Sequence, residues 1–363
     1  MKTTPIIIIL FMLISCGNRA EAVQVASVES DTTIQYTENE LIAFLDSIGK
    51  LNPEAWVKEL SMLVDSTLYN QTTLNYELTN ADFEKLKNAI KEGVIDFDFA
   101  KRIFPELEVD SLFLFGDFKD KFPIELYSFD ENEDDFKEFA ILIGINGISL
   151  NSDVYFFNSK KIIAKHDIFY RYELELKHFK DESGKTVIYY NVCYGSGTGV
   201  WWYQFNFYQY NNEQLTPVLT EIQNINLQPF CLPRLYWIES KVVNEKPLQL
   251  KFVYSNQYSN QFSDVLEGGV GDCPFIDFIN DSTIVTYHID TESGKFIPVF
   301  NDSKLNRNKL LSYFLADNWI DNELLFINEH YDLFLNKLGK NDIIMYNAIM
   351  NYLNELKNAV EKR

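Results

Sequence analysis

Val200–Tyr210 reads Val-Trp-Trp-Tyr-Gln-Phe-Asn-Phe-Tyr-Gln-Tyr, and this stretch decides the fold class. Side chains alternate between the two faces of a strand, so residues two apart share a face. One face then carries Trp201, Tyr203, Phe205 and Phe207, and the other carries Trp202, Gln204, Asn206 and Tyr208. The pattern predicts a β-strand whose wholly aromatic face lies in a core.

The period of two continues on both sides, from about residue 111 to residue 300. In Tyr170–Lys177 apolar and charged residues alternate, which is typical of a half-buried antiparallel strand. Thr186–Tyr194 is apolar on both faces, as a central strand would be. Further strands are predicted at Leu248–Tyr254 and Ser282–Ile289. We expect an antiparallel meander; the strand order, and a second sheet that would make a sandwich or a partial propeller, stay open.

Turn sequences separate these strands. Asp181–Gly184 predicts a turn, and Gly195–Gly199 predicts a loop or bulge. The sequence Glu-Ser-Gly-Lys occurs twice, at 182–185 and 292–295. No wider similarity accompanies the two copies, so we interpret them as one turn chemistry that arose twice and not as a duplicated unit.

Helices are predicted before the strands from their caps and ends. Two capping-box spacings, each with a threonine three residues before an acid, stand at Thr37/Glu40 and Thr79/Asp82. Gly49 is a suitable end for the first helix. Asn52-Pro53 predicts the start of another helix. Gly93 is the predicted end of the helix that starts at Thr79, and a shorter helix is predicted to stop before Pro105.

Helices also follow the strands. Lys304–Leu315, Asn322–Leu338 and Asn341–Ala359 carry apolar residues three and four positions apart. Gly339–Asn341 is short enough to join the last two as an antiparallel pair. The fold class is therefore α+β: an N-terminal helical unit, a central antiparallel sheet and C-terminal helices packed on it. The expected segments are a signal peptide at 1–15, a lipidated flexible tether at 16–36, a helical unit at 37–108, an antiparallel β domain at 109–300 and C-terminal helices at 301–363.

The chain begins with a positive residue, Lys2, and an unbroken apolar run, Ile6–Ile14. The run is far shorter than the ~20 residues that a membrane-crossing helix needs, so it predicts a secretion signal. It ends in Leu13-Ile14-Ser15-Cys16, which resembles the lipobox of bacterial lipoproteins. The resemblance implies cleavage before Cys16, diacylation of its thiol and acylation of the new amino terminus.

Acylation at Cys16 would place the protein in the cell envelope, because several acyl chains together make a durable anchor. Gly17 follows the cysteine, where aspartate would resemble the inner-membrane retention signal of some bacterial lipoproteins. The outer membrane, facing the periplasm, is therefore the expected location, and surface display stays open.

The charge balance narrows the expected partners. Removal of residues 1–15 takes away one lysine and no acid, so the formal net charge changes from −21 to −22. Such a chain does not suit nucleic acid, whose phosphates require clustered Lys and Arg, and only its acyl chains are expected to contact the membrane. A basic protein or a glycan is the expected partner.

Three cysteines remain besides Cys16: Cys193, Cys231 and Cys273. Whether any two of them form a disulfide stays open. Their spacing matches no zinc pattern, so we expect neither a metal nor another cofactor.

The mixed face of Val200–Tyr210 contains the candidate binding residues. Trp202 and Tyr208 would project from the sheet on this face. Together with Tyr254 and Tyr258 they would present an exposed platform for a sugar ring or a protein partner. The alternative is that helices cover this face.

No set of catalytic residues stands out. Gly184–Thr186 and Gly195–Gly199 lack the glycines of phosphate-binding loops, and Asp130–Asp135 lacks the glycine of a calcium loop. His288 and Asp290 would share one strand face and could position a base. No nucleophile accompanies them, so we interpret His288 as a surface residue. His166 and His330 are interpreted in the same way.

These observations favour a lipid-anchored envelope protein that binds a protein or glycan partner and is not an enzyme. An immunity protein that neutralises a basic toxin is one specific version. The competing class is a periplasmic hydrolase that uses carboxylates and acts on envelope polymers, which a chain with 53 acidic residues leaves open. The oligomeric state stays open as well.

Overall fold

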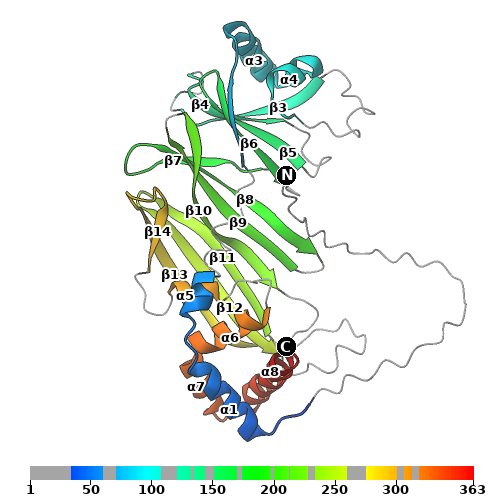
Figure 1. Cartoon of the computed structure of the whole chain (residues 1–363), viewed down its shortest axis with the longest axis vertical. Coiled ribbons are helices and arrows are strands. Elements are labelled where there is room, and N and C mark those ends of the chain that lie inside the picture. The colour runs from blue at the N-terminus through cyan, green and yellow to red at the C-terminus, as the bar shows by residue number, and fades with distance from the viewer. Residues whose placement is uncertain are drawn as a thin grey trace, which may run out of the picture. The chain divides into compact units, whose positions relative to one another are not determined.

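The structure is a computed structural model. It describes residues 34–59, 71–107, 121–130, 132, 135–143, 151–169, 174–197, 200–211, 213–227, 234–259, 275–300, 306–312 and 319–363. The predicted signal peptide and tether up to residue 33, including Cys16, lie outside these residues, as do Cys231 and Cys273. The elements below belong to one compact unit, Gln35–Arg363. It combines helices near both ends with two antiparallel sheets, which confirms the predicted α+β class (Figure 1).

Helix α1, Glu38–Gly49, begins at the predicted capping box. The Thr37 hydroxyl accepts the Glu40 N–H at 3.4 Å, and the Glu40 carboxylate accepts the Thr37 N–H at 2.7 Å. The helix ends at Gly49, where a Cβ would lie only 2.6 Å from the Tyr331 ring. Its buried residues are Leu41, Leu45 and Ile48.

Helices α3, Asn80–Glu92, and α4, Phe97–Ile103, also follow the sequence signals. The Thr79 hydroxyl accepts the Asp82 N–H at 3.1 Å at the start of α3. Gly93 follows α3 with a φ of 70°, a conformation in which a residue with a Cβ would be strained. The helix predicted after Asn52-Pro53 is described over residues 54–59.

The first sheet has six antiparallel strands in the order β1-β6-β5-β4-β3-β2. Their bounds are Gln71–Glu77 (β1), Val94–Asp96 (β2), Lys121–Ser128 (β3), Glu138–Ile143 (β4), Asn151–Asn158 (β5) and Lys161–Phe169 (β6). Strands β1 and β2 lie within 37–108, for which the sequence predicts helices alone. Both are edge strands. Their conformation depends on pairing with β6 and β3, which is tertiary context that a local pattern does not carry.

The second sheet has eight strands in the order β14-β13-β12-β11-β10-β9-β8-β7, so the predicted meander is confirmed. Their bounds are Lys177–Lys180 (β7), Thr186–Gly197 (β8), Val200–Asn211 (β9), Gln214–Leu227 (β10), Arg234–Glu245 (β11), Leu248–Ser259 (β12), Phe275–Ile289 (β13) and Phe296–Phe300 (β14). The central strand predicted at 186–194 is confirmed by β8, which is buried on both faces. The strand predicted at 170–177 is wrong at 174–176, because β7 begins only at Lys177.

The two copies of Glu-Ser-Gly-Lys form hairpin turns at opposite edges of the eight-stranded sheet, between β7 and β8 and between β13 and β14. Asp181 directly precedes the first copy, and Asp290 lies two residues before the second. Each carboxylate accepts the serine N–H, Asp181 at 2.8 Å and Asp290 at 2.7 Å. The glycines, Gly184 and Gly294, have φ values of 81° and 68°. The first turn is closed by a bond from the Asp181 N–H to the Lys185 carbonyl oxygen, and the second, one residue longer, by a bond from the Asp290 N–H to the Lys295 carbonyl oxygen. The two copies therefore share their turn chemistry but not their length.

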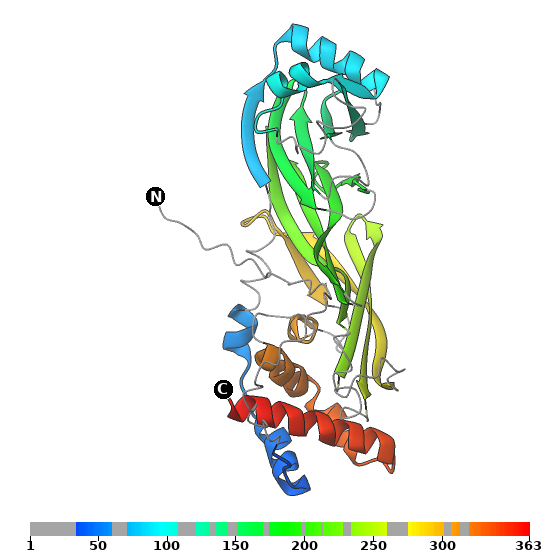
Figure 2. The ribbon, with the colours of Figure 1, turned by 90° about the vertical axis from the view of Figure 1, so that its right-hand side faces the viewer.

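The C-terminal helices are α5 (Arg307–Leu311), α6 (Trp319–Glu329), α7 (Tyr331–Leu338) and α8 (Ile343–Glu361). The single helix predicted at 322–338 is two helices, divided at His330. The short connection predicted at Gly339–Asn341 joins α7 and α8. Figure 2 shows α1, in blue, beside α8, in red, and the two are in contact.

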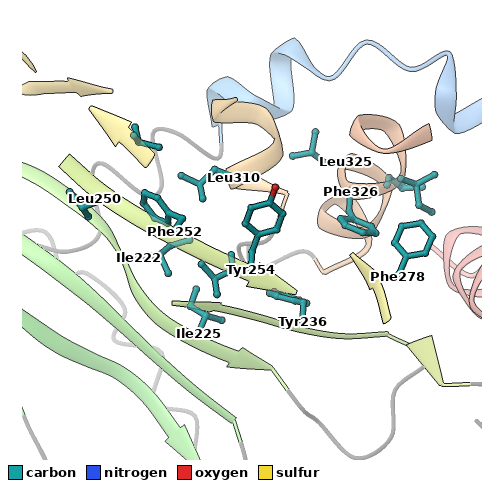
Figure 3. Close-up of a cluster of buried hydrophobic side chains, with 14 of the residues drawn as sticks. Ile222, Ile225, Tyr236, Leu250, Phe252, Tyr254, Phe278, Leu310, Leu325 and Phe326 are labelled. Atoms are coloured by element: carbon teal, nitrogen blue, oxygen red, sulfur yellow. The ribbon is translucent and has the colours of Figure 1, made fainter. Parts of the chain in front are cut away.

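Three hydrophobic clusters hold these layers together. The largest lies between the eight-stranded sheet and helices α1, α5, α6, α7 and α8; part of it is drawn in Figure 3. A second joins the two sheets, and a third lies between the six-stranded sheet and helices α3 and α4. The helices therefore cover one face of the sheet that was predicted to offer a binding platform.

Candidate functional site

The four residues predicted to form an exposed aromatic platform are buried or partly buried in the structure. Tyr208, Tyr254 and Tyr258 are buried, with exposed fractions of 1%, 5% and 0%, and Trp202 is partly buried. Tyr254 and Tyr258 lie under the C-terminal helices, and Tyr208 lies in the cluster between the sheets. The expected exposure is thus wrong for the three tyrosines, because helices and a second sheet cover them.

Tyr258 illustrates how completely the platform is covered. Its ring centroid lies 4.9 Å from that of Phe278 on β13 and 5.0 Å from that of Tyr352 on α8. Contacts of this kind are typical of an aromatic core. Strand β12 therefore contributes Tyr258 to the core and not to a surface.

Tyr254, on the same strand, has a second role, because it also lines a cleft. The cleft has a volume of about 620 Å³. It forms where the end of α1, strands β12 and β13, helix α5 and the corner between α6 and α7 come together. Its lining residues are Gly49, Tyr254, Ile279, Asp281, Lys309, Asn328, Glu329, His330, Tyr331, Asp332 and Leu333. We call this site the corner cleft.

The sheet contributes the base of the corner cleft. Tyr254 and Asp281 are directly opposite each other on β12 and β13, so their side chains are neighbours on one face. Figure 3 shows Tyr254 rising from its strand toward the helices, with Leu310 and Phe326 nearby. The cleft thus joins an aromatic ring and a carboxylate on rigid strands.

The α6–α7 corner contributes the opposite side. His330 has φ −116° and ψ 17° and is not helical, so it separates the end of α6 from the start of α7. Because of this break, the consecutive residues from Asn328 to Leu333 all line the cleft. A continuous helix would spread six consecutive side chains around its axis.

His330 is half-buried, so its interpretation as a surface residue is wrong. Its Nδ1 lies 2.8 Å from the Phe326 carbonyl oxygen and donates to it, and its ring packs 4.5 Å from the Phe326 ring. Burial, above all, lowers the pKa of His330 to about 4. The imidazole is neutral at neutral pH, and its Nε2 can then only accept a hydrogen bond.

Two further cleft residues have their donors occupied by the fold. Asn328 Nδ2 donates to the carbonyl oxygens of Ile48 at 2.8 Å and Leu51 at 3.1 Å. The Tyr331 hydroxyl donates to Asp46 Oδ1 at 2.6 Å. These bonds fix the α6–α7 corner against α1 and leave the Asn328 side chain with its oxygen as an acceptor.

The interpretation of His166 as a surface residue is also wrong, but this histidine does not line the corner cleft. It is fully buried between the two sheets, and its ring lies 4.4 Å from that of Tyr208. Burial lowers its pKa to about 3. A histidine that stays neutral and enclosed by aromatic rings is a structural residue. His288 is exposed, as predicted, and Asp290 is used in the β13–β14 turn.

A second group of titratable residues lies on β5 and β6. Lys165 Nζ lies 2.9 Å from Asp167 Oδ1 and 3.3 Å from Asp153 Oδ2, and it donates to the Glu106 carbonyl oxygen at 2.8 Å. Burial and the hydrogen bond to Asp167 raise the pKa of Asp153 to about 7. The buried lysine donates to a carbonyl oxygen and lies within ion-pair distance of two carboxylates, which is the arrangement of a structural ion-pair network.

Other candidate features are equally structural. The Asp130 carboxylate accepts the N–H groups of Lys137 and Glu138 at 2.6 Å and 3.2 Å, as a loop cap does. Cys193 is a buried free thiol. Among the described residues, no three His, Cys, Asp or Glu side chains are grouped so as to hold a metal ion. None of the described helices is long and apolar enough to cross a membrane.

No protein-family model matches this sequence, and no curated protein or solved structure shows a significant match to the chain.

Proposed function

We propose that the protein is a lipid-anchored cell-envelope protein that binds a partner in the corner cleft and does not act as an enzyme. The observation that carries the proposal is a 620 Å³ cleft whose Asn328, His330 and Tyr331 side chains are already held by hydrogen bonds to the fold. A site that is ordered before binding loses little conformational entropy when its partner arrives. Such a site suits recognition.

The anchor in this proposal rests on the lipobox resemblance at Cys16. The tether would end where Tyr36 is fixed on α8, because its N–H donates to Asn354 Oδ1 at 3.0 Å. Some 20 residues between Cys16 and Tyr36 would span at most about 70 Å. Helix α1 follows at once and reaches the corner cleft at Gly49. The cleft would thus stay within a short reach of the membrane.

Cross-linking from the cleft tests the binding role. A photoreactive amino acid at Leu333 should capture a discrete partner in envelope preparations, whereas the same group at the exposed Glu239 of β11 should not. Capture from both positions alike, or from neither, would refute a specific partner at this cleft. Co-expression with secreted toxins from neighbouring genes tests the immunity version, and the absence of rescue in every pairing would remove it.

The competing class, a periplasmic hydrolase acting on envelope polymers, is favoured by one observation. Asp281, Glu329 and Asp332 all line the same cleft, and hydrolysis of glycosidic bonds uses a pair of carboxylates. Incubation with purified envelope polysaccharide and peptidoglycan would reveal it. Product release that is lost in Asp332→Asn and kept in Glu239→Gln would replace the binding role with catalysis.

A further inference from the structure

The turn that follows α4 is held against the six-stranded sheet by two side chains. The Tyr155 hydroxyl donates to the Pro105 carbonyl oxygen at 2.8 Å, and Lys165 Nζ donates to the Glu106 carbonyl oxygen at 2.8 Å. Tyr155 and Lys165 are directly opposite each other on β5 and β6, so they lie side by side on one face. We call Pro105–Glu106 the 105–106 turn.

The 105–106 turn has a strained backbone. Glu106 has a φ of 57°, in the left-handed region that residues with a Cβ avoid, and its own side chain is exposed. Such a conformation costs free energy and persists only where surrounding contacts hold it. The bonds from Tyr155 and Lys165 are contacts of this kind, so the turn should open more readily if one of them weakens.

Lys165 connects this turn to a pair of carboxyl groups. Its Nζ lies 2.9 Å from Asp167 Oδ1 and 3.3 Å from Asp153 Oδ2, and its side chain is only 4% exposed. Asp153 and Asp167 are directly opposite each other on β5 and β6. Two neighbouring carboxylates repel each other when both are ionised, so the pair retains a proton to a higher pH than either group alone. A single ammonium group therefore contacts both carboxyl groups and the turn.

Among the described residues, few charged groups face Asp153. From β6, Lys165 and Asp167 have the largest effect on its charge, and the 105–106 turn contributes a main-chain carbonyl oxygen. From β4, the apolar Ile143 lies opposite Asp153. His166 is neutral, because burial lowers its pKa to about 3. The proton belongs to Asp153, since its side chain is 12% exposed and that of Asp167 is 57% exposed.

We propose that this group is a proton-dependent latch: the 105–106 turn stays closed while Asp153 holds a proton, and loss of that proton to the solvent favours opening. Ionised Asp153 places a second negative charge beside Asp167 and no longer donates a hydrogen bond to it. Lys165 is then drawn toward Asp153 and away from the Glu106 carbonyl oxygen. A buried carboxylate is also costly unless it is hydrated, and opening of the turn admits water.

The latch should weaken as the pH rises. In the closed state the pKa of Asp153 is raised to about 7, chiefly by burial, whereas a hydrated aspartate has a pKa of about 4. Opening therefore releases a proton across this interval, so the closed state is most stable below pH 4 and loses stability up to pH 7. Between pH 5 and pH 8 the opening equilibrium should rise by up to about a hundredfold.

Hydrogen exchange in the full-length protein tests the latch. Amides of the segment 101–107 should exchange up to about a hundredfold faster at pH 8 than at pH 5, after correction for the intrinsic effect of pH on exchange. They should also exchange faster than the amides of β8 at each pH, because the opening is local. An unchanged corrected rate, or a rate no faster than that of β8, would overturn the proposal.

Two variants separate the proton from the turn. Asp153→Asn has no proton to lose, so exchange in 101–107 at pH 8 should stay near its value at pH 5. Tyr155→Phe removes the bond to Pro105 and should raise exchange several-fold at both pH values while keeping the pH dependence. Glu125→Gln changes an exposed carboxylate of β3 and should behave as the unmodified protein does. A pH dependence that persists in Asp153→Asn, or is lost in either of the other variants, would assign the titration to another group and refute the latch.

Discussion

His166 Nδ1 lies 2.7 Å from the Tyr190 hydroxyl, and this pair joins the six-stranded sheet to the eight-stranded sheet. On the other side of the ring, Nε2 lies 3.0 Å from Gln71 Oε1 on β1. An amide oxygen can only accept, so Nε2 carries the proton and Nδ1 accepts from Tyr190. Gln71 in turn donates to the Leu215 carbonyl oxygen of β10 at 2.9 Å. The sheets are therefore connected by a buried polar chain as well as by apolar packing.

Tyr190→Phe should lower the free energy of unfolding by about 1–3 kcal/mol, the cost of leaving a buried acceptor without its donor. The ring itself is retained, so packing changes little. Tyr76→Phe is the matched control, because the Tyr76 hydroxyl is on an exposed residue and its bond to Arg102 is long, at 3.4 Å. Urea unfolding of both variants measures the difference. Equal stabilities would show that the His166–Tyr190 bond contributes nothing.

His166 should also make stability depend on pH. The unfolded chain takes up a proton near the ordinary pKa of 6.5, whereas the folded protein does so only at about 3. The unfolded state thus binds more protons in this window, and stability falls as the pH is lowered from 6.5. The slope approaches about 1.4 kcal/mol per pH unit. His166→Gln should show a flatter dependence between pH 6 and pH 4.5, and an unchanged slope would contradict the assignment.

The contrast between capping boxes and the aromatic face shows what the sequence can predict. Thr37 and Glu40 are three residues apart, and the bonds that start α1 are made within that short stretch. Tyr258 shows the opposite case. Its strand periodicity is correct, but its burial depends on Phe334 and Tyr352, which come more than 70 residues later. A local pattern gives the face on which a side chain lies and not what covers that face.

The same limit applies to the corner cleft. Its lining comes from α1, β12, β13, α5 and the α6–α7 corner, and only folding brings these segments together. His330 was visible in the sequence as a histidine beside Glu329. The break that it makes between α6 and α7 was not visible, because the apolar spacing continues on both sides of it.

Asp153→Asn should stabilise the protein at pH 8 and have little effect at pH 4. The folded-state pKa of Asp153 is raised to about 7, so the folded protein keeps a proton that the unfolded chain has lost. Stability therefore decreases as the pH rises from about 4 to 7, by roughly 1 kcal/mol per pH unit. An asparagine side chain does not ionise, so Asp153→Asn removes this dependence of stability on pH.

Asp167→Asn is the control for Asp153→Asn. Burial opposes ionisation of Asp167, but hydrogen bonds to Lys165 and Asp153 outweigh burial and lower its pKa. Asp167→Asn should therefore destabilise the protein at pH 8. Thermal unfolding at both pH values separates the two variants, and stabilisation by both would contradict the assigned protonation states.

Arg234 and Glu323 form a buried ion pair between β11 and α6. Arg234 Nε donates to Glu323 Oε2 at 2.6 Å, and Arg234 Nη1 donates to Asn256 Oδ1 at 2.8 Å. Glu323→Gln should lower the free energy of unfolding by about 3–5 kcal/mol, because it leaves a buried guanidinium without its counter-charge. The double variant Arg234→Met/Glu323→Met should recover much of the loss. Denaturant unfolding measures both, and additive losses would show that the two charges are not coupled.

Gly49→Ala should disturb the corner cleft through a single methyl group. The new Cβ would lie 2.6 Å from Tyr331 Cδ2 and 2.8 Å from Cγ, so the whole ring must move and its bond to Asp46 must lengthen. Overpacking of this kind costs about 1–3 kcal/mol. Gly339→Ala is the matched control, because its Cβ would meet nothing closer than the Leu335 carbonyl oxygen at 3.4 Å. The thermal unfolding temperature should be lower in Gly49→Ala than in the unmodified protein and unchanged in Gly339→Ala. If Gly49→Ala were as stable as the control, the close contact between α1 and Tyr331 would not constrain this side of the cleft.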